Sequence, residues 1–524
     1  MKKVKSVVIV GGGSSGWMSA AYLSRVLFDL DITLVESRNT PRIGVGEATT
    51  PILTRFMQRL GFDQWESWLP EVDGTIKTGI LFENWYEKGD WYWHPFEALD
   101  YLDHRHHIGH GWLQLNRNGD PDFPDRSSFY RAFYLSTILN CECAKRPVLK
   151  NFAFHINADL FADFLRKTCP KVRHVMDDVT EVRLNPAGEI EGLVTSDHGI
   201  LKADLFIDCT GFRRKLIRQV DPHQPYESYA ESLFCNRAVV LRFPYGENGS
   251  QATEMHPYVK ASAQSSGWTW TIPLFSRISS GYVYSSSFLS DEEAERELRE
   301  YWGYQRTKDV VPLKVKFESG KLKDLWVKNC VPIGLAGSFV EPLESTGLAI
   351  TQVGLELLAS ILDARCYDDA MQARYNMHLQ KFCDDVKQFI IAHYFPTNRE
   401  DTPFWRAVKH DTKIPDDLAA RLEVFRTLLP TDSTKGTEEW WFFRDISWFS
   451  VLLGMNYAFK TPQLDSSLME KAKAIASKRL QVVQEHTKNM PSHFDYLNNR
   501  LYGPRERVRQ VLKNGIGNLT HVGQ

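Results

Sequence analysis

Three glycines near the start of the chain have the spacing of a phosphate-binding turn. Gly11, Gly13 and Gly16 follow the β-branched run VKSVVIV and open a helical pattern. Glycines at these places allow a tight turn, let the backbone approach a pyrophosphate and let a helix pack on a strand, while the helix start binds the anion. Glu36 ends a second strand-like run, DITLVES, 20 residues after Gly16, where a carboxylate accepts ribose hydroxyls. The pattern predicts a dinucleotide-binding unit, with an incidental glycine-rich turn as the alternative.

Two tryptophans one residue apart form a second notable pattern. Trp268 and Trp270 stand in SSGWTWTIPL, between a Ser/Gly turn and an Ile-Pro pair. Side chains at i and i+2 of a strand lie on the same face. Two large rings on one face most often pack in a core, and this is the plain interpretation of the pair by itself.

The run EPLESTG, from Glu341 to Gly347, introduces another helical pattern. Free backbone N–H groups at a helix start suit an anion. Capping of the helix by the side chain of Ser345 or Thr346 accounts for the same residues and remains the alternative.

Histidines are concentrated in DHRHHIGH, where His106 and His110 are four residues apart. A helix would place both on one face. The run lacks the glutamate of an H-E-x-x-H zinc motif, so we expect no metal site there.

A large fold must position these residues. The chain has 524 residues, of which 43% are hydrophobic, and at ~150 residues per domain this predicts two or three domains or one composite unit. The formal net charge of −2, without long blocks of one sign, indicates no nucleic-acid or membrane partner. The first apolar run stops at Val10, no run approaches the ~18 apolar residues of a membrane span, and the eight cysteines show no C-x-x-C spacing. We therefore expect a soluble, reduced, cytoplasmic protein that acts on small molecules.

Three further runs extend the nucleotide-binding unit. ADLFIDCTGFR is an apolar strand that breaks at Thr210-Gly211, and NCVPIGLAGSFVEP is a buried strand that enters a glycine-rich turn at Gly334 to Gly337. RIGVGEATTP has the composition of a loop whose backbone runs close to a ligand. Ordinary strand ends and a surface turn are the alternatives.

Taken together, G-x-G-x-x-G, GVGEAT, DCTGFR, W-x-W-x-I-P and EPLESTG resemble, in this order, the flavin-dependent halogenases of the tryptophan-halogenase family. The resemblance runs from about residue 5 to about Leu497, and W-x-W-x-I-P is its most distinctive part. It implies an α/β (α+β) chain with a glutathione-reductase-like FAD-binding fold and an inserted and C-terminal, mainly helical substrate module. The FAD contacts that it implies are Gly11, Gly13, Ser14, Gly16, Glu36, Ala48, Gly334 and Leu335.

The resemblance also implies how hypohalous acid is made. The residues that would shield the flavin are Trp268, Trp270, Ile272 and Pro273. Large aromatic rings beside the isoalloxazine would keep an organic substrate away, so that only a small halide ion reaches the flavin-bound oxygen. The halide would be bound by the backbone of Thr346 and Gly347.

The matched catalytic residues are Lys77, Glu344 and the neighbouring Ser345. An ammonium donor polarises hypohalous acid or forms a haloamine, and a carboxylate stabilises and deprotonates the arenium intermediate. Ser345 would support this chemistry by hydrogen bonding. By residue type alone, a lysine or a glutamate is a surface residue.

The substrate site implied by the resemblance has two parts. His94, Pro95 and Phe96 match the family's H-P-F, whose histidine and phenylalanine line the aromatic pocket. In GTEEWWFFRDISWF, Trp440 falls near the family's two tyrosines, Arg444 aligns with the glutamate that pairs with the amino group of tryptophan, and Ser447-Trp448 is retained.

The exchange of that glutamate for Arg444 inverts a charge. One misplaced buried charge costs ~3–5 kcal/mol, so a tryptophan ammonium would be repelled. The expected substrate is an indole or phenol without the amino-acid head, or an anionic aromatic whose carboxylate meets Arg444.

We expect an FAD-binding module of residues 1–80 and 151–400, a substrate module of residues 81–150 and 401–497, and a C-terminal extension of residues 498–524. Between Gly79 and Asn151 the chain is rich in aromatic residues and histidines and loses the period-2 strand pattern. The basic extension is expected to be a surface or subunit contact, so a homo-oligomer is possible.

The expected cofactors are FAD, supplied reduced as FADH2, and a halide ion, with O2 and a small aromatic molecule as substrates. No second G-x-G-x-x-G follows a strand, so we expect a separate flavin reductase to supply the FADH2. The alternatives are a tryptophan halogenase, a flavin aromatic monooxygenase that holds its substrate against the flavin, and a non-catalytic carrier on a flavoprotein scaffold.

Overall fold

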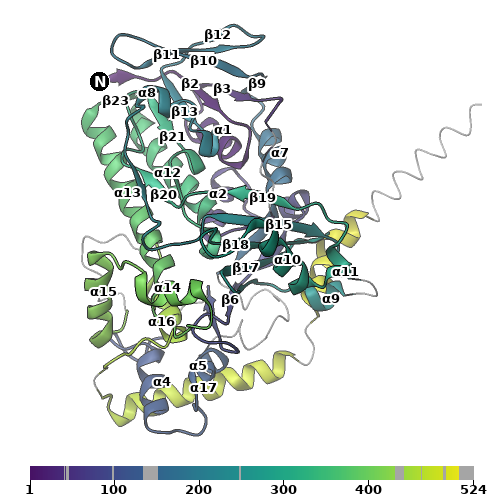
Figure 1. Ribbon diagram of the computed structural model, residues 1–524, viewed down its shortest axis with the longest axis vertical. Coiled ribbons are helices and arrows are strands. Elements are labelled where there is room, and N and C mark those ends of the chain that lie inside the picture. The colour runs from purple at the N-terminus through teal and green to yellow at the C-terminus, as the bar shows by residue number, and fades with distance from the viewer. Residues whose placement is uncertain are drawn as a thin grey trace, which may run out of the picture.

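A computed structural model of the chain describes residues 1–40, 42, 46–96, 100–133, 151–246, 250–430, 442–461, 463–487 and 491–506. A five-stranded parallel sheet lies toward one end of the molecule, a mainly helical region lies at the other, and a seven-stranded sheet lies between them (Figure 1). This mixed α/β architecture confirms the expected fold class.

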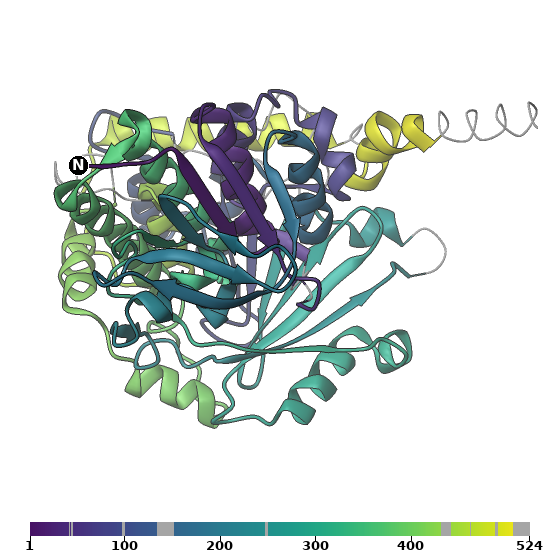
Figure 2. The same cartoon turned by 90° about the horizontal axis from the view of Figure 1, so that it is seen from above.

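The predicted strand–turn–helix–strand unit forms the centre of the parallel sheet. The strand order is β21 (Cys330–Pro332), β13 (Leu205–Asp208), β2 (Ser6–Val10), β3 (Asp31–Glu36) and β9 (Arg173–Met176). The central strands β2 and β13 are almost entirely buried and apolar, as expected of strands covered on both faces, whereas the edge strand β9 is partly exposed. Helix α1 (Ser14–Val26) follows β2 and packs against α7 (Ala158–Thr168) and α12 (Gly347–Ile361). Seen from above, helices cover one side of β2 and β3, and the hairpin of β10 (Val179–Leu184), β11 (Ile190–Thr195) and β12 (Ile200–Leu201) covers the other (Figure 2).

Two of the three motif glycines are required by packing. Gly11 has a φ of 121°, and a Cβ there would lie 2.3 Å from the carbonyl oxygen of Cys209. A Cβ on Gly16 would lie 1.8 Å from the carbonyl oxygen of Gly11, so only glycine lets α1 start this close to β2. A Cβ on Gly13 would meet no atom of the described chain within 4 Å.

The seven-stranded sheet carries the paired tryptophans. Its order is β19 (Leu313–Lys316), β15 (Arg237–Phe243), β18 (Ile278–Tyr284), β17 (Gly267–Pro273), β16 (Val259–Ala263), β6 (Gly79–Glu83) and β7 (Trp91–Pro95). Strand β6 pairs parallel with β16, and the other neighbours are antiparallel.

The expectation that the strand pattern ends at Gly79 is wrong, because β6 and β7 follow. Tyr92, Trp93 and His94 of β7 are all buried, since helices pack on this strand. A strand buried on both faces shows no alternation of polar and apolar residues. The expected module boundary at residue 80 therefore falls inside β6.

A small antiparallel sheet joins the nucleotide-binding loop to the middle of the molecule. Its order is β4 (Gly46–Ala48), β8 (Ala153–Asn157) and β5 (Thr75–Lys77). Ala48 and Thr75 are both partners of His155, and Lys77 is paired with Ala153. Lys77 thus ends a strand beside the loop that the sequence assigned to the flavin.

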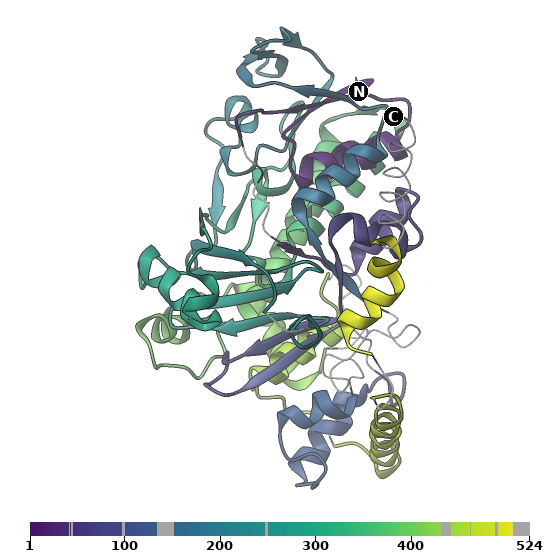
Figure 3. The ribbon, with the colours of Figure 1, turned by 90° about the vertical axis from the view of Figure 1, so that its right-hand side faces the viewer.

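The C-terminal part is helical, as predicted from its pattern. It contains α14 (Pro403–Asp411), α15 (Asp416–Thr427), α16 (Asp445–Gly454), α17 (Ser466–Thr487) and α18 (His493–Leu497). Helix α17 packs against α4 (Ile108–Arg117) and α5 (Arg126–Phe133) at the end away from the parallel sheet (Figure 3). Helix α16 packs against β7, and α13 (Asp369–Ala392) contacts both α12 and α16.

Shorter elements complete the described chain. They are α2 (Ile52–Arg59), α3 (Trp65–Trp68), α8 (Ile217–Val220), α9 (Gln251–Glu254), α10 (Asp291–Trp302), α11 (Tyr304–Thr307), β1 (Lys2–Lys3), β14 (Tyr226–Ser228), β20 (Gly320–Leu322), β22 (Ser338–Phe339) and β23 (Cys366–Tyr367). One segment, Gly347–Ala364, is long and apolar enough to span a membrane, but 61% of it is buried inside the protein, which is typical of a core helix.

The glycine contacts predict different stabilities for two matched substitutions. Gly16→Ala should lower the free energy of unfolding by ~1–3 kcal/mol, because its methyl group would collide with backbone. Gly13→Ala should leave stability nearly unchanged, because Gly13 has an ordinary φ of −79° and open space around its Cα. Thermal unfolding of both variants without ligand checks this, and equal melting temperatures would contradict it.

Candidate active site

The end of β3 and the start of α1 form a cradle suited to a dinucleotide. The carboxylate of Glu36 lies against the glycine turn, since a Cβ on Gly12 would be 2.0 Å from its Cδ. Arg42 donates from Nε (3.0 Å) and Nη2 (2.7 Å) to Glu36 Oε1, and His174 Nε2 lies 3.0 Å from Oε2. These contacts hold the carboxylate where a ribose would bind. The open space at Gly13 and the free N–H groups at the start of α1, from Ser14, fit a pyrophosphate.

The second glycine-rich turn meets this cradle. Gly334 and Leu335 lie in a 3₁₀ turn (Gly334–Ala336) directly after β21. A Cβ on Gly334 would lie 2.2 Å from Oγ of Ser15 in α1, and Ser15 Oγ is 3.2 Å from Oγ1 of Thr351 in α12. The starts of α1 and α12 and this turn therefore converge. Ala48, on β4, is buried.

The start of α12 is shaped by one strained residue. After the 3₁₀ turn Pro342–Glu344, Ser345 adopts the left-handed conformation with a φ of 60°. Thr346 occupies the N-cap position without a side-chain capping bond, and its Oγ1 has no hydrogen-bond partner among the described residues. Side-chain capping therefore does not explain this motif. Gly347 is exposed, and the space around its Cα is open within the described chain.

Lys77 is fully buried beside this turn. Its Nζ donates to the carbonyl oxygen of Thr49 (3.0 Å) and to Oγ of Ser345 (2.8 Å), and lies 5.1 Å from the centre of the Phe96 ring. Burial lowers the pKa of Lys77 to about 7, although the nearby carboxylate of Glu344 acts in the opposite direction. The amine is thus held with two acceptors at the junction of the flavin loop and α12.

Glu344 is buried between two histidines. His94 Nδ1 is 2.7 Å from Oε2, and His393 Nε2 is 3.0 Å from Oε1. Burial raises the pKa of Glu344, but the two histidines lower it more, to about 2. His94 Nε2 is 2.8 Å from Oγ of Ser447, and His393 Nδ1 is 2.8 Å from the hydroxyl of Tyr92. The carboxylate of Glu344 thus has one oxygen hydrogen-bonded to His94 and the other within ion-pair distance of His393, and its lowered pKa favours the ionised form.

The paired tryptophans lie on one face of β17, as their spacing predicts. Trp268 and Trp270 are both buried, with ring centres 6.2 Å apart. Trp268 Nε1 donates to Glu341 Oε1 at 3.0 Å, which connects the ring to the segment just before the 3₁₀ turn Pro342–Glu344. A Cβ on Gly281 would lie 2.2 Å from the Trp270 ring, so this glycine makes room for it.

The end of β17 contacts the strand of the lysine. Ile272 and Pro273 are buried, and the carbonyl oxygen of Pro273 accepts from Oγ1 of Thr75 at 2.6 Å. Strand β17 also contacts β4 of the flavin loop. The W-x-W-x-I-P segment thus contacts both β4 of the flavin loop and the strand that ends at Lys77.

Aromatic rings surround His94 on the other side of the site. Its ring is 5.9 Å from that of Phe96 and 5.4 Å from that of Phe389 in α13, and Pro95 is buried beside it in β7. Trp448 of α16 is buried with its ring 5.1 Å from that of Phe389. Trp440 lies outside the described residues.

Arg444, which the sequence analysis aligned with the glutamate that pairs with the amino group of tryptophan, does not occupy a buried position. Arg444 is exposed at the N-cap of α16, where its backbone is extended (φ −80°, ψ 177°). A solvated guanidinium is screened by water, so the cost of a buried charge does not apply there. The neighbouring side chain, Phe443, is buried instead and stacks on Phe389 at 3.8 Å between ring centres.

The histidine-rich run makes no metal centre in the part of the chain that the structure describes, where no three His, Cys, Asp or Glu side chains could hold an ion together. His106 precedes α4, so the two histidines do not share a helix as their spacing suggested, although their rings are 5.0 Å apart. His106 pairs with Asp103 at 2.9 Å.

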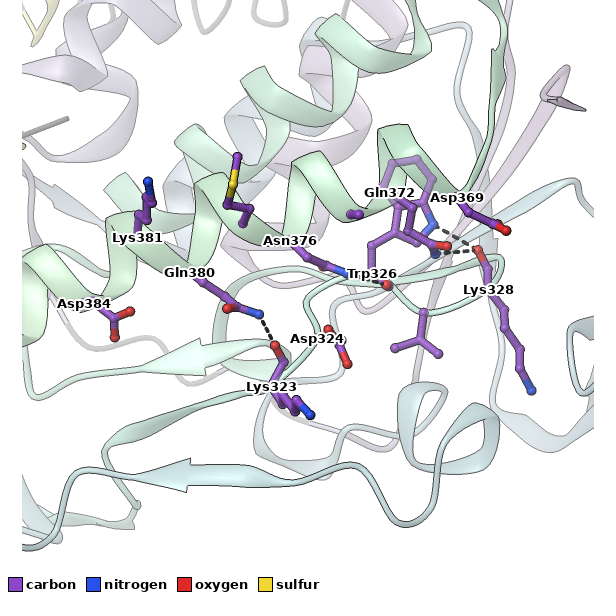
Figure 4. A pocket seen from close by; sticks show the side chains of 13 residues that line it. Lys323, Asp324, Trp326, Lys328, Asp369, Gln372, Asn376, Gln380, Lys381 and Asp384 are labelled. Atoms are coloured by element: carbon purple, nitrogen blue, oxygen red, sulfur yellow. Dashed lines mark hydrogen bonds between the residues drawn. The ribbon is translucent and has the colours of Figure 1, made fainter. Parts of the chain in front are cut away.

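A surface groove of about 640 Å³ runs along α13, away from these residues (Figure 4). Gln372, Asn376 and Gln380 of the helix donate to backbone carbonyls of the segment Lys323–Lys328. The polar side chains here attach that segment to the helix, which is a structural role.

Three buried residues of the site were missed by the sequence analysis. His393, Phe389 and Tyr92 have no motif of their own, and α13 was assigned to the flavin module. The signal that existed is weak: Tyr92 stands two residues before His94 of the H-P-F motif, on the same face of β7.

The chain is similar in sequence and in fold to known proteins. The family model for tryptophan halogenases matches residues 6–470. The tryptophan 6-halogenase SttH of Streptomyces toxytricini is 34% identical over 94% of this chain and 97% of its own length, and its crystal structure superposes with a TM-score of 0.86. The tryptophan 7-halogenase RebH of Lentzea aerocolonigenes is 35% identical over 81% of this chain and 82% of its own. Xcc4156, a flavin-dependent halogenase from Xanthomonas campestris, is 30% identical with a TM-score of 0.83, over 95% of this chain and 99% of its own.

The open space at Gly13 predicts a ligand effect separate from stability. Gly13→Ala should weaken FAD binding at least about tenfold, because a methyl group would occupy the approach to the pyrophosphate. Its melting temperature without ligand should match that of the unsubstituted chain. Quenching of flavin fluorescence during titration measures the Kd, and an unchanged Kd would place the pyrophosphate elsewhere.

The low pKa of Lys77 predicts a pH-dependent stability. Between pH about 7 and 10.5 the unfolded chain keeps the lysine proton that the folded chain has lost, so the free energy of unfolding rises with pH in this window. The slope contributed by Lys77 is at most ~1.4 kcal/mol per pH unit. Below pH 7 both states are charged, and the cost of burial applies in full.

Lys77→Met removes this contribution and is the matched reference. The unfolding free energy of the unsubstituted chain minus that of Lys77→Met should therefore rise from pH 7 to 9.5, as measured by chemical denaturation at each pH. A difference that stays constant over this range would mean that the ammonium keeps its ordinary pKa.

Proposed function

The chain belongs to the tryptophan halogenase family, and from this premise we propose that it transfers halogen from hypohalous acid, through Lys77 and Glu344, to an electron-rich indole- or phenol-type ring. As a member of this family it is a flavin-dependent halogenase that uses FADH2 and halide, and a separate flavin reductase is the family's usual arrangement. When bound, reduced FAD supplies, with O2, the oxidising equivalent that converts halide into hypohalous acid.

The start of α12 is suited to hold the halide. Gly347 is exposed there, and the first N–H groups of the helix have no partner within the helix. Trp268 and Trp270 are buried on one face of β17, a strand that contacts both β4 of the flavin loop and β5, which ends at Lys77. Bulky rings at this place exclude an organic substrate from the flavin while leaving room for a small ion and for hypohalous acid.

The observation that carries the proposal is the buried amine of Lys77. A lysine is almost never fully buried unless it is paired or used, because desolvation of its charge is costly. Two of its three donors bond Thr49 and Ser345. The remaining donor suits the oxygen of hypohalous acid, which it would polarise so that the halogen becomes electrophilic.

Lys77 and Glu344 alone account for every proton moved in the halogen transfer. The halogen leaves the oxygen of hypohalous acid and bonds to a ring carbon, and the oxygen takes a proton from Lys77 and departs as water. The proton on that ring carbon passes to the carboxylate of Glu344, which restores aromaticity. Held by His94 and His393, the carboxylate is aimed before substrate binds.

The arrangement of these residues fits a monooxygenase or a non-catalytic carrier less well. An aromatic monooxygenase needs the ring against the flavin, where Trp268 and Trp270 would be in the way. A carrier needs neither Lys77 nor Glu344, and both are fully buried at a cost that binding alone does not require.

A product screen tests the proposal. The purified chain, FAD, a flavin reductase, NADH, O2 and chloride or bromide are incubated with indoles and phenols, and the products are identified by mass spectrometry. The unsubstituted chain should give monohalogenated rings. Lys77→Met should lower product formation at least about 100-fold while O2 uptake continues, because it leaves the flavin reaction intact.

The matched control is Lys321→Met, which removes another buried lysine. Lys321, on β20, is paired with Asp384 at 2.5 Å, and its loss should preserve halogenation. Full activity of Lys77→Met would exclude the role of Lys77, and hydroxylated products without halogen would support the monooxygenase.

A further inference from the structure

The segment before α16 decides which of two consecutive side chains faces the site. Its backbone at Arg444 is extended, and successive side chains of extended backbone point to opposite sides. Arg444 is exposed, whereas only 5% of Phe443 is accessible. The sequence pattern suggested that a charge lies near the substrate, but the structure turns an aromatic ring inward.

Phe443 belongs to the aromatic group around the Glu344 site. Its ring lies nearly parallel to that of Phe389, with 3.8 Å between centres and 19° between planes, and is 6.0 Å from the ring of His94. His94 in turn bonds the carboxylate of Glu344. A molecule that binds next to His94 and Glu344 therefore lies near the ring of Phe443.

Two charged side chains next to this segment, Asp385 and Arg421, are paired with one another. Asp385 accepts the backbone N–H of Phe442 at 2.8 Å and pairs with Arg421 at 2.9 Å. The guanidinium of Arg421 lies 5.2 Å from the centre of the Trp448 ring. An ammonium or carboxylate brought against the Phe443 ring gains no partner from this pair unless the pair is broken, and an unpaired charge against an apolar ring is unfavourable.

We propose that Phe443 is a specificity-determining residue, which makes the site select aromatic rings without a charged head group. This inference rests on the proposed function, because it assumes that the ring to be halogenated lies between Lys77, Glu344 and His94. It assigns the selection to an apolar wall that disfavours either sign of charge.

Equilibrium binding tests the inference independently of catalysis. The ligands share one ring and differ in the head: 3-methylindole (none), tryptamine (ammonium), indole-3-propionate (carboxylate) and tryptophan (both). Isothermal titration calorimetry with the full chain should show 3-methylindole binding at least about tenfold more tightly than each charged ligand, since a single desolvated charge accounts for that factor.

Substitutions then distinguish the effect of Phe443 on ligand binding from that of Arg444. Phe443→Glu should tighten tryptamine relative to 3-methylindole at least about tenfold and weaken indole-3-propionate, because a carboxylate replaces the apolar ring. Phe443→Gln has the same length without the charge and controls for the lost volume. Arg444→Glu should change these Kd ratios less than about twofold, because that side chain is exposed.

Three results would overturn the inference: Kd ratios that respond to Arg444→Glu and not to Phe443→Glu, equal affinity of the unsubstituted chain for all four ligands, or tightest binding of tryptophan. Phe443→Glu does not fold if its melting transition is lost. In that case the ligand Kd ratios of Phe443→His are compared with those of Phe443→Leu, which sets a side chain that can carry a charge against an apolar one of similar size. The product screen and the binding test have independent outcomes. A chain that binds 3-methylindole selectively but halogenates no substrate contradicts the proposed function and not the selectivity assigned to Phe443.

Discussion

The hydrogen bond from Nζ of Lys77 to Oγ of Ser345 joins two residues that are 268 positions apart in the chain. A buried amine needs acceptors, and those available are the Thr49 carbonyl after β4 and the Ser345 hydroxyl before α12. Satisfying it requires that the flavin loop, the end of β5 and the start of α12 meet at one place. These elements surround the proposed halide site and Glu344. The need of the buried Lys77 amine for acceptors therefore brings the site together, and the burial of that amine lowers the stability of the fold.

Ser345, in the left-handed conformation, separates two parts of the EPLESTG segment that have different roles. A non-glycine residue at a φ of 60° costs of order ~1 kcal/mol and persists only when its surroundings hold it in place. The turn lets Glu344 point to His94 and His393 while the next residues begin α12 with their N–H groups free. Glu341, one turn earlier, accepts from Trp268 at 3.0 Å and from the hydroxyl of Tyr394 at 2.5 Å, and so ties β17 to the same segment. One short segment thus bonds the Trp268 ring, carries Glu344 and leads into the proposed halide site.

The site is a composite of parts that the expected modules kept apart. Strand β7, assigned to the substrate module, belongs to the same sheet as β17, and α13, assigned to the flavin module, supplies Phe389 and the contacts to α16. His94 and His393 reach Glu344 from these two elements. A rigid sheet and a long helix hold the two histidines at fixed positions, so that both lie within 3.0 Å of the Glu344 carboxylate before any substrate binds.

Sequence patterns alone determined the local units: the glycine turn with Glu36, the shared face of Trp268 and Trp270, and a helix that begins at Gly347. Each depends on spacing within one short stretch, where backbone sterics and side-chain period act. The strands β6 and β7 were not predictable in this way, because burial on both faces removes the alternation that marks a strand. Nor were His393, Phe389 and the inward turn of Phe443. Their positions depend on how β7, α13 and α16 pack, and a side chain beside a helix start faces inward or outward according to that packing rather than its own type. Tertiary structure therefore decided what surrounds Glu344, because the contacts that orient it come from residues far apart in the chain.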